Sequence, residues 1–259
     1  MLRRIFSFIL ILGLILIPFS ADAAVKKKAK KTVRTVEIQT PDEIILTGTL
    51  TIPEAAGVKN KVPLVILMHS LGGNKAIYTK LANDLKEKNI ASFALDVRGH
   101  HQSTTKLNGK KTYWQNYTEK TFSKYPDDIK TVVSFLNEHY VALDTNRLGI
   151  LGADISANTA IIAANKNQNI TKSLVLFSPT MEFKGLKTPQ ALMNYGNHPV
   201  MIIVTQGDIY HYKEAVLLEK YAEGETKFIT TKTGGTGDTI LKLNPYLNNI
   251  IVDWFLKYL

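Results

Sequence analysis

The residues best placed to do chemistry in this chain surround Asp154. An apolar run at residues 148–151 precedes a turn of small residues, Gly152-Ala-Asp154-Ile-Ser156, and then an alanine-rich stretch that reaches about Lys166. This order predicts a buried strand, a sharp bend and a helix. The Asp154 carboxylate would then lie at a helix N-terminus, where negative charge is favoured by about 0.3–1 kcal/mol. A carboxylate in this position can accept backbone hydrogen bonds or attack an electrophile as a nucleophile.

The elements that must position Asp154 alternate between strands and helices. Residues 34–39 and 44–52 alternate apolar and polar side chains, which predicts an antiparallel hairpin at the start of the domain. Continuous apolar runs follow and predict strands buried on both faces, with helical spacing between them. The pattern indicates an α/β fold with a mostly parallel, doubly wound sheet, helices on both of its faces and no large cap. The predicted later strands are 63–68, 90–95, 148–151, 173–177, 200–205 and 227–231.

The length and composition fit one folded domain behind an export signal. The chain has 259 residues, 45% of them hydrophobic and 21% charged, and no break in composition. Residues 1–23 combine two arginines, an apolar run and a small-x-small end, which predicts a cleaved signal peptide and a secreted or periplasmic protein. Residues 24–34 are predicted to be a basic disordered leader, and residues 35–259 the domain. The absence of cysteine excludes disulfides and a thiolate nucleophile.

The positive charge is concentrated in the leader. The formal charge of the whole chain is +10, but residues 35–259 hold 24 basic and 21 acidic side chains, a net +3. The nearly neutral domain gives no reason to expect a nucleic-acid partner. The lysines of the leader predict at most a weak contact with an anionic surface. They are Lys26, Lys27, Lys28, Lys30 and Lys31.

Three stretches, in the right order and at the right distances, resemble motifs of the α/β-hydrolase family. His69-Ser70-Leu71-Gly72-Gly73 is similar to the family's oxyanion loop, and the turn from Asp96 to Ser103 is similar to the turn after its fourth strand. Gly152 to Ser156 resembles the nucleophile elbow. The overall run is most similar to compact dienelactone-hydrolase-like and serine-aminopeptidase-like members.

The resemblance implies a nucleophile, an acid and a histidine in that chain order. It places Asp154 at the nucleophile position, Asp208 at the acid position and Gly237 where the histidine belongs. It also implies oxyanion-hole N–H groups from Leu71 and Ile155. Residues that would line the site by the same resemblance are His69, Ser70 and His101.

Two of the three triad positions are therefore replaced, which favours a pseudoenzyme that is non-catalytic or binds a small-molecule ligand. The alternative is an active hydrolase with a recruited base such as His101. It would be an esterase, a dienelactone-hydrolase-like enzyme or a dehalogenase-like enzyme with an Asp nucleophile. Such an Asp nucleophile needs a base to activate the water that cleaves its ester intermediate. The sequence predicts no cofactor and no metal site.

Overall fold

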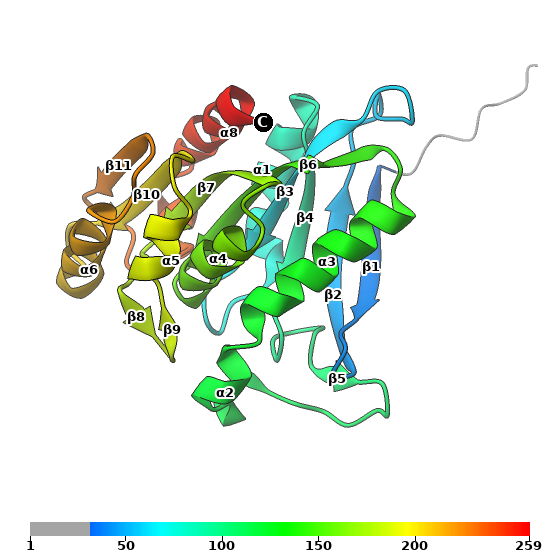
Figure 1. Cartoon of the computed structure of the whole chain (residues 1–259), viewed down its shortest axis with the longest axis horizontal. Coiled ribbons are helices and arrows are strands. Elements are labelled where there is room, and N and C mark those ends of the chain that lie inside the picture. Colours follow the sequence, from blue (N-terminus) through cyan, green and yellow to red (C-terminus); the bar gives the residue numbers. More distant parts are fainter. Residues whose placement is uncertain (1–31) are drawn as a thin grey trace, which may run out of the picture. The chain divides into compact units, whose positions relative to one another are not determined.

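The computed structural model describes residues 32–259, which form one sheet with helices packed on it (Figure 1). Nine strands join this sheet, and a small separate hairpin is formed by β8 (Glu182–Phe183) and β9 (Leu186–Lys187). The nine strands are β1 (Val33–Gln39), β2 (Ile44–Thr51), β3 (Val62–Met68), β4 (Ala91–Asp96), β5 (Thr105–Lys106), β6 (Leu143–Ala153), β7 (Thr171–Phe177), β10 (Val200–Thr205) and β11 (Thr226–Thr231).

The strand order is β1-β2-β4-β3-β6-β7-β10-β11, with β5 paired to β2. Neighbouring strands are parallel along the part β4-β3-β6-β7-β10-β11 of this order. In contrast, β1 pairs antiparallel with β2, and β2 pairs antiparallel with β4. The sequence-based prediction of a mostly parallel sheet with an opening antiparallel hairpin is confirmed. Because β3, β6, β10 and β11 are parallel, the turns that follow them emerge at the same edge of the sheet.

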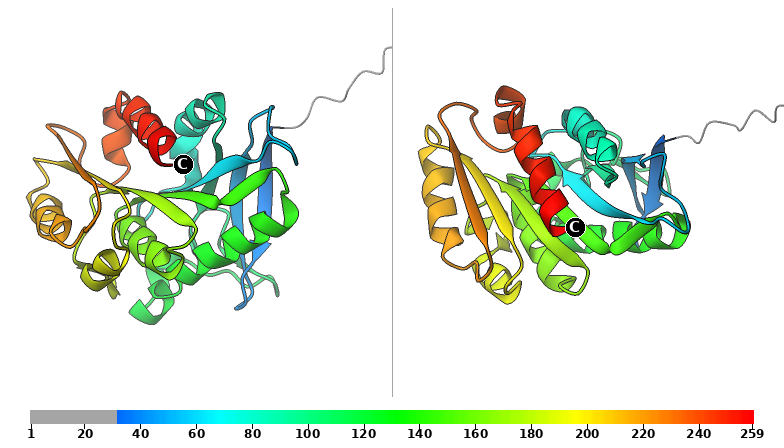
Figure 2. Two further views of the ribbon diagram at one scale, coloured as in Figure 1. Left: turned by 45° about the horizontal axis from the view of Figure 1, so that its top comes forward. Right: turned by 90° about the horizontal axis from the view of Figure 1, so that it is seen from above.

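Helices cover both faces of the sheet (Figure 2). Helices α1, α7 and α8 pack on one face, and α3, α4, α5 and α6 pack on the other. Within residues 32–259 no helix has the length and apolar composition needed to cross a membrane. The helices are η1 (Lys75–Tyr78), α1 (Thr79–Glu87), η2 (Trp114–Asn116), α2 (Glu119–Phe122), α3 (Tyr125–His139), α4 (Ile155–Lys166), α5 (Pro189–Asn194), α6 (Ile209–Glu219), α7 (Thr239–Leu243) and α8 (Leu247–Tyr258).

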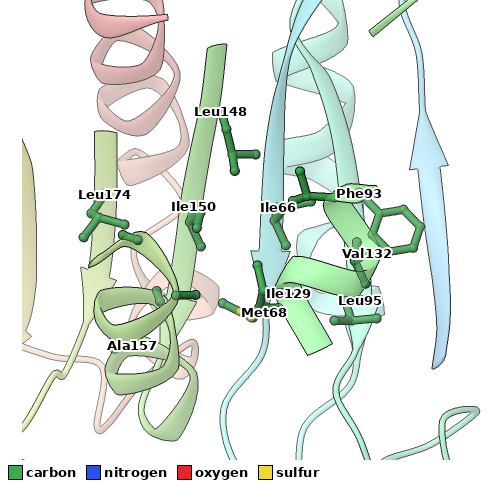
Figure 3. Packing of buried hydrophobic residues seen from close by; sticks show 14 of the residues in the cluster. Ile66, Met68, Phe93, Leu95, Ile129, Val132, Leu148, Ile150, Ala157 and Leu174 are labelled. Atoms are coloured by element: carbon green, nitrogen blue, oxygen red, sulfur yellow. The ribbon is translucent and has the colours of Figure 1, made fainter. Parts of the chain in front are cut away.

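The core beneath α3 and α4 explains why the central strands read as continuous apolar runs. Ile66 of β3 and Ile150 of β6 point from the sheet toward Ile129 of α3 and Ala157 of α4 (Figure 3), and all four side chains are fully buried. The opposite face of the same strands packs against α1 and α8. A strand that is covered on both faces has no polar side to show.

The start of the domain and one helix differ from the prediction. Strand β1 begins at Val33, two residues before the predicted domain start, because Val33 and Arg34 pair through their backbones with Thr51 and Leu50. Helix α7 was missed, since five residues after a glycine-rich turn give too short a pattern. The predicted signal peptide (1–23), the leader up to residue 31 and its lysines lie outside the described residues.

Candidate active site

The elbow at Asp154 has the strained geometry that its sequence predicts. Asp154 has φ +56°, in the left-handed region that residues with a side chain rarely adopt. The turn is so tight that a Cβ on Gly152 would lie 2.0 Å from the carbonyl oxygen of Ser156. The Asp154 N–H donates to the carbonyl of Phe177 at 2.9 Å. The elbow therefore holds the Asp154 side chain at the tip of the turn between β6 and α4.

The Asp154 carboxylate occupies the predicted oxyanion hole. Its Oδ2 accepts a hydrogen bond from the backbone N–H of Leu71 at 3.1 Å, and the N–H of Ile155 also donates to this carboxyl group. Burial raises the pKa of the Asp154 carboxyl, and these two N–H groups oppose that rise. The N–H groups of Leu71 and Ile155, predicted as oxyanion donors, thus already serve the protein's own carboxylate.

Asp208 lies just after β10, at the N-terminus of α6, and it orients a histidine. Its Oδ2 lies 2.8 Å from Nδ1 of His211 and accepts a hydrogen bond from the Thr236 hydroxyl, while Oδ1 accepts from the His211 N–H at 3.3 Å. Although burial raises the pKa of Asp208, the bonds from Thr236 and His211 outweigh burial and hold it below its ordinary value.

His211 is the residue that our sequence reasoning missed. The loop of Thr236 and Gly237 links its acid to the elbow, because the Thr236 hydroxyl donates to Asp208 and a Cβ on Gly237 would lie 3.2 Å from Asp154 Cβ. The resemblance places the family's histidine in the loop after β11, where this chain has Gly237, and the only substitute base named from the sequence is His101. The spacing Asp208-x-x-His211 at a helix start was the available signal, because residues three apart there lie within reach of each other.

The loop between β11 and α7 presents an acid and not a histidine. A Cβ built on Gly237 would lie 2.1 Å from Ser70 Oγ and 3.2 Å from Asp154 Cβ, and Gly237 has φ +61°. An imidazole at position 237 therefore does not fit beside Ser70. The next residue, Asp238, has the side chain that reaches the site, where its Oδ2 accepts from the Ser70 N–H at 2.9 Å.

The predicted site residue His69 and the elbow residue Ser156 both have structural contacts. The His69 ring is fully buried, with Nδ1 at 2.8 Å from the Ser70 carbonyl and Nε2 accepting from the Val97 N–H at 3.1 Å. Because both nitrogens are used, His69 ties two loops together and does not reach a ligand. Ser156 is also fully buried, and its hydroxyl donates to the His69 carbonyl at 2.6 Å.

The structure does not bring His101 to Asp154. The ring of His101 lies 3.0 Å from Asp96 Oδ2, an acid that also pairs with Lys75. His101 lines a cleft of about 340 Å³ between the β1–β2 hairpin and α1, which shares Asn74 and Thr79 with the groove described below. The Asp96 carboxylate holds this ring, and no hydrogen bond joins it to Asp154, so the assignment of His101 to substrate binding stays a prediction.

A groove begins beside the site. It has a volume of about 840 Å³ and runs between α1 and α7. Its lining includes Gly73 of the oxyanion loop and Asp238, whose carboxylate accepts from the Ser70 N–H, but not Asp154. Among residues 32–259 no group of three His, Cys, Asp or Glu side chains is arranged to hold a metal ion. The other residues that line the groove include Asn74, Ile77, Lys80 and Lys242.

A left-handed elbow after a central parallel strand, two oxyanion N–H groups and an acid after a later strand define an α/β hydrolase fold. Comparison with solved structures agrees. Dienelactone hydrolase from Anabaena variabilis superposes with a TM-score of 0.67 at 14% identity, over 88% of this chain and 98% of that one. Est1E from Butyrivibrio proteoclasticus, solved with ferulic acid bound, superposes with a TM-score of 0.68 at 19% identity, over 86% and 98%. At such identities the likeness shows the fold alone.

The sequence itself gives the family. The family model described as serine aminopeptidase, S33, matches residues 59–203. The chain belongs to this family of α/β hydrolases. A curated relative, the monoglyceride lipase homolog of monkeypox virus, is 28% identical over 116 residues, which are 45% of this chain. The match spans 38% of that relative's length.

Proposed function

We propose that this protein is an exported α/β-hydrolase-fold protein that binds a small molecule at the Asp154 elbow and lacks the acyl-transfer chemistry of serine hydrolases. One observation carries the proposal: the Asp154 carboxylate accepts hydrogen bonds from Leu71 and Ile155, the donors that acyl transfer needs. In acyl transfer these donors stabilise the oxyanion that forms in the transition state. A carboxylate already bound there would repel that developing charge.

The other parts of the serine machinery support the same conclusion. No hydroxyl stands at the elbow tip, and the nearby Ser156 donates its proton to a backbone carbonyl inside the protein. The loop that carries the family's histidine offers Gly237 and Asp238. Removing one oxyanion donor alone costs about 10²–10³ in turnover, and losing triad members costs about 10⁴–10⁶.

The ligand class is argued from the groove and from the relatives. The groove is open to solvent along α1 and α7 and reaches the site at Gly73 and Asp238. The name of the curated relative suggests glycerides as one class to test, and the Est1E structure suggests ferulic acid as another. Export is proposed from the signal-peptide pattern of residues 1–23 alone.

The test combines binding with turnover. Purified protein should bind a monoacylglycerol or ferulic acid in calorimetry, and should not hydrolyse p-nitrophenyl acetate or the monoacylglycerol above background. Asp84→Ala, a change at a surface ion pair of α1, serves as the matched control for Asp154→Ala. Ester hydrolysis by the wild type and by Asp84→Ala that disappears in Asp154→Ala would contradict the proposal.

A further inference from the structure

The cleft between the β1–β2 hairpin and α1 has the features of a second binding site. We propose that it binds a neutral polyhydroxyl compound, up to the size of one sugar ring. The cleft volume of about 340 Å³ lies within the range of roughly 300–1,000 Å³ that is typical of small-molecule sites. Neither Asp154 nor its donors Leu71 and Ile155 line the cleft, so this inference goes beyond the function proposed for the elbow.

Strands β1, β2 and β4 form the floor of the cleft. Thr49 and Thr51 lie two positions apart on β2, so both side chains point to the same face of the sheet. Ala94 of β4 pairs with Thr49, and Val33 of β1 pairs with Thr51. Directly paired residues share a face. The floor therefore presents two hydroxyl groups beside two apolar side chains, a surface that suits a compound with both C–H and O–H groups.

The hydroxyl of Thr51 is the strongest indication of a polar ligand. Thr51 lines the cleft although only 3% of it is exposed, and within residues 32–259 its hydroxyl makes no hydrogen bond. Ser92, directly opposite on β4, has a buried hydroxyl that also lacks a partner in this part of the chain. A buried hydroxyl without a partner is unfavourable. A ligand hydroxyl above Thr51 would supply the missing hydrogen bond.

Helix α1 adds uncharged polar groups on the other side of the cleft. Thr79 and Asn83 are four residues apart and therefore lie on one face of the helix, with Ala82 between them. The Thr79 hydroxyl donates to the Ala76 carbonyl at 2.8 Å, and its oxygen can still accept a hydrogen bond. The exposed amide of Asn83 can both donate and accept. Hydroxyl groups of a ligand likewise both donate and accept.

The charged residues at the cleft balance each other. Lys75 pairs with the buried carboxylate of Asp96, and Nδ1 of His101 lies 3.0 Å from Asp96 Oδ2. Although burial raises the pKa of Asp96, the hydrogen bonds from Lys75 and His101 outweigh burial and hold it below its ordinary value. The charges of Lys75 and Asp96 cancel, and a neutral His101 ring adds none. This balance favours a neutral ligand over an anion or a cation.

His101 offers the cleft an acceptor on a strained backbone. An ionised carboxylate only accepts hydrogen bonds, so the neutral ring carries its proton on Nδ1, and Nε2 can accept. The side chain is 54% exposed, and no residue of the described chain bonds to this Nε2. His101 has φ +40°, which residues with a side chain rarely adopt. Backbone strain of this kind is concentrated at ligand sites and active sites.

The test follows the backbone amide signals of the isotope-labelled, purified protein by NMR. D-glucose, myo-inositol and glycerol are the probes, and we expect saturable shifts around Thr51, Asn83 and His101. Thr51→Val keeps the branched shape of the side chain and should weaken binding roughly 2- to 12-fold, the factor that one neutral hydrogen bond contributes. Thr230→Val, at an exposed position of β11, is the matched control and should bind as the wild type does.

The role of the imidazole is tested in the same way. His101→Ala removes the accepting nitrogen and should weaken binding of the three probes, whereas His139→Ala, at an exposed position of α3, should not. Glucosamine and glucuronate carry a positive and a negative charge on the same ring as glucose. Both should bind no more tightly than glucose, and tighter binding of either would overturn the neutral class of ligand.

The elbow provides the last control. Asp154→Ala should leave binding of the three probes unchanged, because this side chain lies outside the cleft. Loss of binding in this variant would overturn the inference and would support the small-molecule site proposed at the elbow. Shifts that persist unchanged in both Thr51→Val and His101→Ala, or no saturable shift with any of the three probes, would also overturn it. These last two results leave the proposal for Asp154 intact, so the two proposals fail separately.

Discussion

The hydroxyl of Ser70 occupies the place where a side chain at residue 237 would begin. A Cβ on Gly237 would lie 2.1 Å from Ser70 Oγ, and this oxygen accepts a hydrogen bond from the Asp238 N–H at 2.9 Å. The turn has room for a serine at 70 or for a side chain at 237, but not for both. A histidine at position 237 would therefore fit the turn only if Ser70 were also replaced by glycine.

We expect Gly237→Ala to lower the free energy of unfolding by roughly 1–3 kcal/mol, because it adds both backbone strain and a collision. Chemical denaturation measures this loss. Gly109→Ala is the control for strain alone, since Gly109 also has a positive φ, +80°, but open space around its Cβ. It should cost only about 1 kcal/mol. The double variant Ser70→Gly, Gly237→Ala should recover the difference, and equal losses at 237 and 109 would contradict the steric argument.

The second prediction concerns the stability cost of Asp154. Burial raises the pKa of this carboxyl above its ordinary value of 3.8. A raised folded-state pKa means that the folded protein binds the proton more tightly than the unfolded chain. The stabilisation is fully present below about pH 3.8 and is lost as pH rises through the folded-state pKa.

Asp154→Asn should therefore be more stable than the wild type at neutral pH, since the amide oxygen keeps the bond from Leu71 and carries no charge. The gap in Tm should close as the pH falls toward 3.8. Thermal melts across this range provide the measurement. Asp253→Asn, at an exposed position of α8, should show no such closing gap. A gap of the same size at every pH would speak against buried charge as its cause.

The third prediction concerns two buried imidazoles. Burial lowers the pKa of both His69 and His100 from 6.5 to about 4. On acidification the unfolded chain then binds protons that the folded protein does not bind. The free energy of unfolding should therefore fall as the pH drops from 6.5 toward 4. His100→Phe should flatten part of this fall.

In the same variant the phenyl ring can keep the stacking on Trp114, but the Gly72 N–H loses its acceptor, His100 Nε2 at 3.0 Å. We expect a loss of about 1–3 kcal/mol at neutral pH. Thermal melts at several pH values measure both effects. His139→Gln should leave the pH dependence of the Tm unchanged. If His100→Phe does not change it either, groups other than His100 cause the loss of stability in acid.

The strands of the sheet could be predicted because burial leaves a pattern of apolar residues within each strand's own sequence. Continuous apolar runs such as residues 63–68 reflect burial on both faces, and the alternation in 34–39 reflects burial on one. The prediction gave β6 as residues 148–151, whereas the strand spans Leu143–Ala153. Leu143 and Asp144 pair with β3 before a register shift, and the segment up to Arg147 is polar, so hydrophobicity alone could not show it.

The candidate site was only partly predictable because it depends on side chains that are distant in sequence. The elbow and the N–H donors follow from motif spacing, and in the structure the Leu71 N–H donates to Asp154. The contacts of Asp208 with His211 and Thr236 depend on where α6 and the β11–α7 loop lie in space. The sequence separates Ser70 from Gly237 by most of the domain, so their collision had no local signal.

The left-handed backbone of Asp154 has a consequence for the history of this site. Holding a residue with a Cβ at φ +56° and ψ −122° carries a standing cost of about 1–3 kcal/mol, which glycine escapes. Where nothing requires the carboxylate, random drift should replace it with glycine. Homologues that keep aspartate at the elbow therefore retain it at a cost in folding stability. The substitutions found at this position among them indicate whether the acid is used.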